Sequence, residues 1–211
     1  LALALKGGNL ESARYLAAKI PAGKKFAVYP GKQTPFHLAA WHTPQALGDL
    51  VDAYRAAPDF PSLLDSPDAS GMTALALALR RGSLYGANAL LDAGASLAKA
   101  GADGWTPLTL ALRSGNLSLV QLVIEKAPSG PGSTSLTKGW TPLMLAARYC
   151  PLALDLLVSE SIGPQEMNRK NAEGFTALHL AVLGGNTDAV AWLLDKGADK
   201  NIADAGGKTA L

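Results

Sequence analysis

The sequence has little of what marks several large classes of protein. It contains a single cysteine, Cys150, which excludes the disulfide-stapled scaffolds of small secreted proteins. No apolar run approaches the ~20 residues that span a bilayer, so we expect no membrane span in this segment. The formal net charge is only +2, which does not indicate nucleic-acid binding by the chain as a whole. We expect the chain to work in the cytoplasm or another reducing compartment.

Aromatic residues are also scarce, at 6% of the chain, whereas hydrophobic residues together make up 48%. A core with this composition must consist mainly of Ala and Leu, which favours closely packed helices. Charged residues make up 17%, and the overall composition is not that of a disordered chain. These proportions favour a folded, helical protein.

Catalytic motifs are missing as well. The sequence has no G-x-S-x-G, no H-E-x-x-H and no G-x-G-x-x-G that opens a helix after a strand. Gly207-Lys208-Thr209 resembles the end of a phosphate-binding loop, but Ile202 stands where that motif requires its first Gly. Asn116-Leu117-Ser118 matches a glycosylation acceptor, yet Asn is expected there as a turn residue. Because nothing assembles a nucleophile, a base or a metal site, we predict that the chain is not an enzyme and holds no cofactor or metal.

What the sequence does contain is an internal repeat. A segment that begins with Thr and continues as Pro/Ala-Leu/Phe-x-Leu-Ala recurs at steps of 39, 33, 35, 35 and 33 residues. The copies, the first and last of them partial, begin near Leu1, Thr34, Thr73, Thr106, Thr141, Thr176 and Thr209. We expect residues 1–211 to form one repeat domain. Since neither end shows the polar cap that terminal repeats need, we also expect the chain to be a fragment of a longer protein.

Each copy carries the signals of a helical hairpin. The Thr can cap a helix, and Pro fits the first turn because that position needs no amide donor. About nine residues later, pairs such as Gly82-Ser83 and Gly185-Asn186 indicate a turn, since Gly readily adopts the left-handed conformation that ends a helix. A second apolar stretch follows, and another Gly stands two residues before the next Thr. One hairpin cannot bury its apolar face alone, so the copies must stack.

Some copies depart from this pattern. Thr43-Pro44 and Cys150-Pro151 replace the Gly-containing turn, and we expect each Pro to start the second helix while the residue before it is extended. The 39-residue step places extra residues at 58–67, and residues 128–135 and 162–164 are also irregular. We expect these three segments to be loops.

The repeat resembles the ankyrin repeat in its Thr-Pro-Leu-His-like start, its Gly at the interhelical turn and its Leu-Leu-x-x-Gly-Ala end. The resemblance covers essentially the whole chain. It implies an all-α solenoid of antiparallel helix pairs, with short β-hairpin or loop fingers and a concave surface made of the fingers and first helices. It also implies that His37 and His179, which share one repeat position, are structural.

Two variable repeat positions open onto the concave surface in ankyrin folds. One directly precedes the Thr, and the other follows it by seven residues, about two helical turns. They predict a partner-binding stripe of large apolar and cationic side chains: Trp41, Met72, Arg80, Trp105, Arg113, Trp140, Arg148 and Phe175. Aromatic residues and Arg dominate binding hot spots, and Arg offers a planar fork to carboxylates or phosphates. In the alternative, structural interpretation, the aromatics pack the fingers and the Arg side chains are ordinary solvated helix residues.

The main functional prediction is a protein–protein interaction module that binds an acidic peptide or protein with apolar anchors on its concave face. A second hypothesis keeps the fold but makes it an intramolecular scaffold or regulatory segment of a larger enzyme or membrane protein. A third makes the Arg/Lys stripe a site for an anionic ligand. Nucleic acid is the least favoured partner, because the total charge is close to zero.

Overall fold

The computed structural model describes residues 1–21, 28–97, 105–126, 139–157 and 164–211. Within these ranges the chain is helical, with short 3₁₀ turns and two isolated β-bridges, Tyr29 to Gln33 and Ala203 to Thr209. It divides into two compact units, Leu1–Leu110 and Ala111–Leu211. The expectation that residues 1–211 form one domain stays a prediction.

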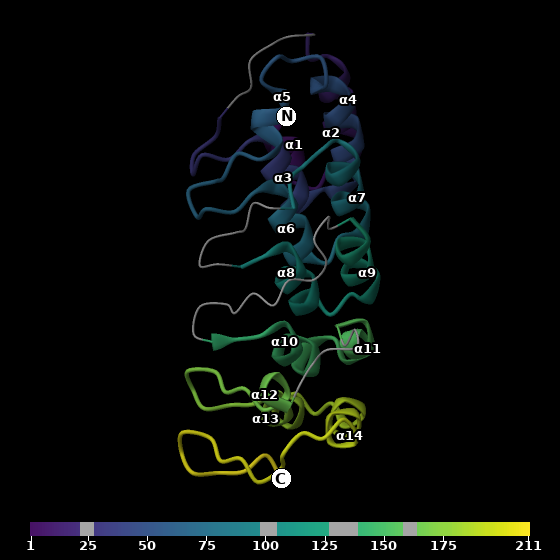
Figure 1. Cartoon of the computed structure of the whole chain (residues 1–211). Helices are drawn as coiled ribbons and strands as arrows, with labels where there is room; N and C mark the ends of the chain where they lie inside the picture. Colours follow the sequence, from purple (N-terminus) through teal and green to yellow (C-terminus); the bar gives the residue numbers. More distant parts are fainter. Residues whose placement is uncertain (22–27, 98–104, 127–138, 158–163) are drawn as a thin grey trace. The chain divides into compact units, whose positions relative to one another are not determined.

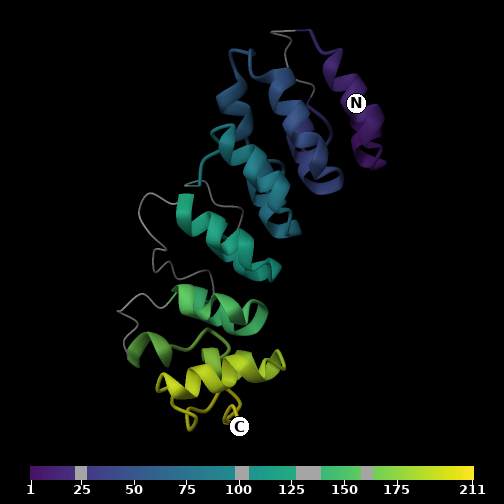
Figure 2. The same ribbon diagram turned by 90° about the vertical axis from the view of Figure 1, so that its right-hand side faces the viewer.

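Unit 1 is built from two rows of helices. The first helices of its repeats are α1 (Ala2–Lys6), α3 (Pro35–His42) and α6 (Ala74–Arg81), and the second helices are α2 (Leu10–Ala18), α4 (Leu47–Tyr54) and α7 (Leu84–Asp92). Figure 1 shows α3 beside α6 in the row of first helices, and α4 beside α7 in the row of second helices. Figure 2 shows the second helices of this unit from their outer side. Leu38, Leu75 and Leu79 are among the fully buried side chains.

Unit 2 repeats the arrangement. Its elements are α9 (Leu117–Lys126), α10 (Pro142–Tyr149), α11 (Leu154–Leu157), α12 (Pro164–Met167), α13 (Ala177–Leu183) and α14 (Thr187–Asp195), while α8 (Pro107–Ser114) contains the boundary between the units. The first helices α10 and α13 pack side by side, and α14 packs against α13 as its antiparallel partner.

The first helices begin as the sequence predicts. α1 starts after Leu1 and has no side-chain cap. By contrast, α3, α6, α10 and α13 each start after a Thr whose side-chain oxygen accepts a hydrogen bond from the amide three residues later, which satisfies a donor that the helix leaves unpaired. These caps are Thr34, Thr73, Thr141 and Thr176. Pro follows the cap in α3 and α10, where the missing amide costs nothing.

The turns after the first helices take two forms. Gly82 and Gly115 have φ of 77° and 73°, and a Cβ at Gly115 would lie 2.9 Å from the carbonyl oxygen of Tyr149, so that position also needs Gly for close approach. In the other form, Thr43 and Cys150 have φ of −143° and −144° and lie outside the helical region. The Pro that follows each of them starts a 3₁₀ turn that continues into the second helix, which confirms the predicted start.

At these turns, different side chains supply a hydrogen-bond donor to an equivalent backbone carbonyl group. The hydroxyl of Thr43 donates to the carbonyl oxygen of Leu5 at 2.7 Å, and the side-chain amide of Asn186 donates to the carbonyl oxygen of Ala147 at 2.9 Å. Leu5 and Ala147 occupy the same repeat position, near the end of the preceding first helix. A Thr-Pro turn can therefore replace a Gly-Asn turn because both supply a donor to this carbonyl group.

The prediction of a loop at residues 58–67 is wrong. This segment contains α5 (Phe60–Leu64), whose Phe60 and Leu64 side chains are only 6% and 1% exposed. The Phe60 ring lies edge-on to Phe36, with ring centroids 6.0 Å apart. Positions four residues apart share one helix face, so the two apolar side chains turn inward together, and Pro61 lies in the first turn, where helices tolerate it. Of the other two predicted loops, residues 128–135 and 162–163 lie outside the described residues.

We expect Phe60→Ala to lower the free energy of unfolding by about 3 kcal/mol, because it removes a buried aromatic ring from the core of unit 1. Ser62→Ala, at an exposed position of the same helix, is the matched control and should change it by less than about 0.5 kcal/mol. Urea unfolding followed by circular dichroism measures both. Equal effects of the two substitutions would mean that α5 adds nothing to the core.

Candidate partner-binding surface

The repeat position seven residues after the Thr brings neighbouring copies together in unit 1. Trp41 lies in the last turn of α3 and Arg80 in the last turn of α6. The guanidinium carbon of Arg80 lies 4.9 Å from the centroid of the Trp41 ring, within the range of a cation–π contact. The Trp41 side chain is half-buried, and that of Arg80 is exposed. Two predicted site residues from successive repeats thus share one patch of surface.

Arg81 joins this patch, and the sequence interpretation missed it. Its guanidinium carbon lies 5.0 Å from the same ring centroid, and its side chain is exposed. The signal was present in the sequence as a second Arg directly after the variable position, which no other described copy has. An interpretation that considers only one variable position per repeat does not include the residue next to it, here Arg81.

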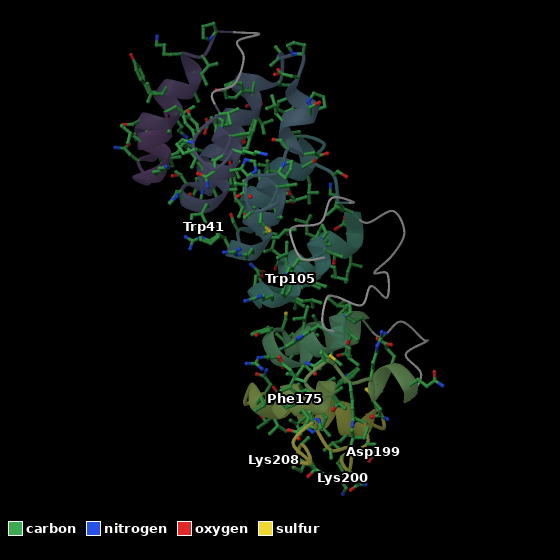
Figure 3. All side chains as sticks on the ribbon, turned by 90° about the vertical axis from the view of Figure 1, so that its left-hand side faces the viewer. Trp41, Trp105, Phe175, Asp199, Lys200 and Lys208 are labelled. Carbon is green, nitrogen blue, oxygen red and sulfur yellow. The ribbon has the colours of Figure 1, made fainter. Side chains whose placement is uncertain are left out.

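Met72 is buried, unlike the other predicted site residues. It is 5% exposed, its amide donates to the carboxylate of Asp68 at 3.0 Å, and its carbonyl oxygen lies 3.0 Å from Nε2 of His37. Its side chain therefore offers almost no surface to a partner, and we leave it out of the proposed site. Trp105, at the equivalent position of the next repeat, is half-buried. Figure 3 views Trp41 and Trp105 from the side on which the finger loops project.

The other predicted residues belong to unit 2. Arg113 lies in the last turn of α8 with an exposed side chain, and Trp140 is half-buried before Thr141. Arg148 lies with its guanidinium carbon 5.4 Å from the centroid of Tyr149, a ring that is 38% exposed. Phe175, labelled in Figure 3, is half-buried, and its ring centroid lies 5.8 Å from that of His179. This contact is of the kind expected if the aromatic residues pack the fingers.

The two equivalent histidines are part of the fold. His37 is fully buried, and its Nδ1 lies 3.1 Å from the amide nitrogen and 2.8 Å from the hydroxyl of Thr34. Its Nε2 lies 3.0 Å from the Met72 carbonyl oxygen, so the contacts fit a neutral ring with its proton on Nε2. His179 repeats the arrangement with Thr176 and the carbonyl oxygen of Lys208.

Two other candidates for chemistry, Cys150 and Asn116, have structural contacts. Cys150 is buried, and that burial raises the pKa of its thiol, which favours the unreactive protonated form. The side chain of Asn116 accepts from the amides of Ser118 and Leu119 at the start of α9. Within the described ranges no three His, Cys, Asp or Glu side chains gather as a metal site would require, and no helix has the length and apolar character to cross a bilayer.

The two arginines beside Trp41 have no ion-pair partner in the part of the chain that the structure describes. The ion pairs described are Arg14 with Asp49, Arg169 with Glu166 and Lys196 with Asp195. Among the described residues, neither Arg80 nor Arg81 has a carboxylate within ion-pair distance. The patch in unit 1 is therefore an aromatic ring covered by two exposed cations that remain open to a ligand.

Comparisons with known proteins agree with this architecture. A family model described as ankyrin repeats, in three copies, matches residues 47–131, 96–165 and 114–204. The crystal structure of the ankyrin repeat domain of Bcl-3, described as a unique member of the IkappaB protein family, is similar with a TM-score of 0.67 and 27% identity, over 99% of this chain and 90% of that one. The human ASB11 ankyrin repeat domain gives a TM-score of 0.73 and 21% identity, over 99% and 88% of the two chains. No curated protein matches the sequence. These likenesses confirm the predicted all-α solenoid.

Acid should weaken the fold through His37. Burial lowers the pKa of His37 below its ordinary value of about 6.5, so as the pH falls below that value the unfolded chain takes up a proton before the folded chain does. The stability that the neutral ring contributes is complete above pH ~6.5 and is lost as the pH falls towards the lowered pKa. We therefore expect the free energy of unfolding to fall as the pH drops below about 6.5, and His37→Gln to reduce that fall.

Urea titrations at several pH values measure this effect. His42→Gln removes an exposed histidine from the end of the same helix and is the matched control. It should leave the pH dependence unchanged. A pH dependence that survives in His37→Gln but disappears in His42→Gln would contradict the assignment.

Proposed function

The chain belongs to the ankyrin repeat family, whose repeats are generally protein–protein interaction modules, and we propose that it binds a peptide or protein on the surface formed by its first helices and fingers. The observation that carries this proposal is the pair of exposed arginines over the Trp41 ring, which have no ion-pair partner among the described residues. Ankyrin repeat domains are typically non-enzymatic, and this supports the further proposal that the chain is not an enzyme.

In each unit, the proposed binding residues are half-buried aromatic rings and cationic side chains at the two variable repeat positions. A ring that is partly covered by its own chain is already held in place, so binding a partner to its open part costs little side-chain entropy. In unit 1 the proposed residues are Trp41, Arg80 and Trp105, and in unit 2 they are Arg113, Trp140, Arg148 and Phe175.

Their chemistry favours a partner with both acidic and apolar side chains. An Arg fork pairs with a carboxylate, while a Trp or Phe ring accepts an apolar side chain. A small inorganic anion would use the arginines but not the rings, so the rings favour a peptide or protein over the anionic-ligand alternative. A segment of the same polypeptide would satisfy the same chemistry, and identification of the bound partner would distinguish the intramolecular alternative.

Affinity capture with the immobilised chain, followed by mass spectrometry, tests the proposal. For a captured partner that is then purified, we expect Trp105→Ala combined with Trp140→Ala to weaken binding by about tenfold or more, because aromatic anchors dominate such interfaces. Binding is measured by calorimetry with variants whose helical content is unchanged.

Trp192→Ala is the control for a lost Trp. Trp192 lies on the second helix α14 and donates from its indole nitrogen to the Asp155 carboxylate at 2.7 Å, so it lies outside the proposed site. Its substitution should leave the affinity unchanged. Undiminished affinity in the double variant would refute the assignment of Trp105 and Trp140 to the site.

A further inference from the structure

Three side chains of unit 1 form a cluster that has a more specific chemistry than the rest of the surface. Arg80 and Arg81 come from the last turn of α6, and Trp41 comes from the last turn of α3 in the preceding repeat. Both guanidinium carbons lie within 5.0 Å of the centroid of the one indole ring. We refer to Trp41, Arg80 and Arg81 as the arginine–tryptophan cluster.

The stability of the fold accounts for one arginine at this place but not for a second one. A cation in the last turn of a helix interacts favourably with the helix dipole, and a single guanidinium suffices for the cation–π contact. A second cation on the same ring adds repulsion between like charges. In the part of the chain that the structure describes, no carboxylate offsets that repulsion. Two cations held together, with no carboxylate beside them in the described residues, favour the binding of an anionic group.

Basic residues also lie in the last turns of the two preceding first helices, Lys6 in α1 and His42 in α3. Asp49 lies in the first turn of α4, but its carboxylate is 3.0 Å from Nε of Arg14 on α2 and is already paired. The acid of the finger, Asp68, accepts hydrogen bonds from Ser70 and from the Met72 amide.

The geometry also selects the kind of anion. A guanidinium over an aromatic ring keeps its in-plane N–H donors free, and those donors match the two oxygens of a carboxylate. The ring holds both arginines in place, which reduces the entropy lost on binding. The half-buried indole leaves part of its own surface for an apolar neighbour. A peptide with two acidic side chains beside an apolar one satisfies all three groups.

We propose that the arginine–tryptophan cluster is the docking point for an acidic peptide segment of a protein partner, with one carboxylate on each arginine. The inference rests on the proposed function, which supplies the source of that segment. It adds Arg81 and assigns the acidic side chains of the partner to one docking point. Because the cations are exposed, the interaction is screened by salt.

The direct test uses a defined probe. It is an octapeptide in which pairs of glutamates alternate with single leucines, and the same peptide with glutamine in place of glutamate is the comparison. Nuclear magnetic resonance of the full chain follows the indole N–H of Trp41 and the Nε–H groups of Arg80 and Arg81. The glutamate peptide should shift all three signals in a saturable way, and raising the salt from about 0.05 M to 0.3 M should weaken its binding several-fold. The glutamine peptide should leave the signals unchanged. Equal shifts with both peptides, or no shift with either, would overturn the proposal.

Variants separate this site from general charge attraction. Arg80→Gln with Arg81→Gln should weaken the glutamate peptide by about tenfold, as expected for two lost charge-assisted contacts. The matched control is Lys19→Gln with Arg55→Gln, which also removes two exposed positive charges from unit 1, including a cation 5.6 Å from the Tyr15 ring. These two residues follow the second helices α2 and α4, which run antiparallel to the first helices, so they lie at the opposite end of each pair. The control should change the affinity less than about twofold.

Two further measurements test whether the arginines recognise a carboxylate in particular. Arg80→Lys with Arg81→Lys keeps both charges but loses the planar forks, so it should also bind the peptide several-fold more weakly. Inorganic phosphate, titrated alone, should shift the arginine signals less than the peptide does at the same concentration. Native affinity in either cluster variant, an equal loss in the control, or a stronger effect of phosphate would overturn the assignment to an acidic peptide.

The outcomes also distinguish this inference from the proposed function. A purified partner that binds the Arg80→Gln, Arg81→Gln variant with native affinity leaves the function standing and overturns the docking point. Binding of the glutamate peptide through the cluster, by a chain that captures no protein, supports the docking chemistry and counts against the function.

Discussion

Stacking one helical repeat on the next buries backbone carbonyl groups between them, and a buried polar group without a hydrogen bond costs about 1–3 kcal/mol. The chain meets this constraint with side chains at fixed repeat positions. On the side of the fingers, His37 and His179 each reach the carbonyl group that precedes the next repeat's capping position. At the interhelical turns, Thr43 and Asn186 donate to the end of the preceding first helix. The repeats that begin at Thr34 and Thr176 are thereby held in register with a neighbour by hydrogen bonds at both ends of their first helices.

The candidate site in unit 1 depends on that register. Trp41 and Arg80 are 39 residues apart in sequence, and they meet only because both follow their capping Thr by seven residues on packed neighbouring helices. The groups that fix the register are buried, whereas Trp41 is half-buried and both arginines are exposed. Folding and recognition thus use different residues of the same helices.

The features that could be predicted from the sequence are those in which one residue meets a local backbone requirement. Thr at the cap, Pro in the first turn and Gly at positive φ each do so without reference to distant residues. The helix at Phe60–Leu64 could not be predicted in this way, because the prolines around it are typical of loops and its stability comes from burial against residues such as Phe36. Met72 was wrongly expected at the surface for a related reason. It shares a repeat position with Trp105, but burial depends on the side chains that surround each position and not on the position alone.

Arg81 shows what a repeat pattern leaves out and why that matters for function. Stacked repeats align equivalent positions into rows, and these rows indicate where recognition residues lie. Residues next to those positions in the sequence are not included in the comparison. Arg81 stands one residue outside the row, yet its long side chain reaches the same ring as Arg80. Among the described residues, neither arginine takes part in the capping or inter-repeat hydrogen bonds, so replacing both should alter the charge of the surface and remove the contacts with Trp41 while those hydrogen bonds remain. That separation is what makes binding and stability independently testable in this chain, and it is the reason why the two-arginine cluster, and not the buried Met72, carries the proposed specificity.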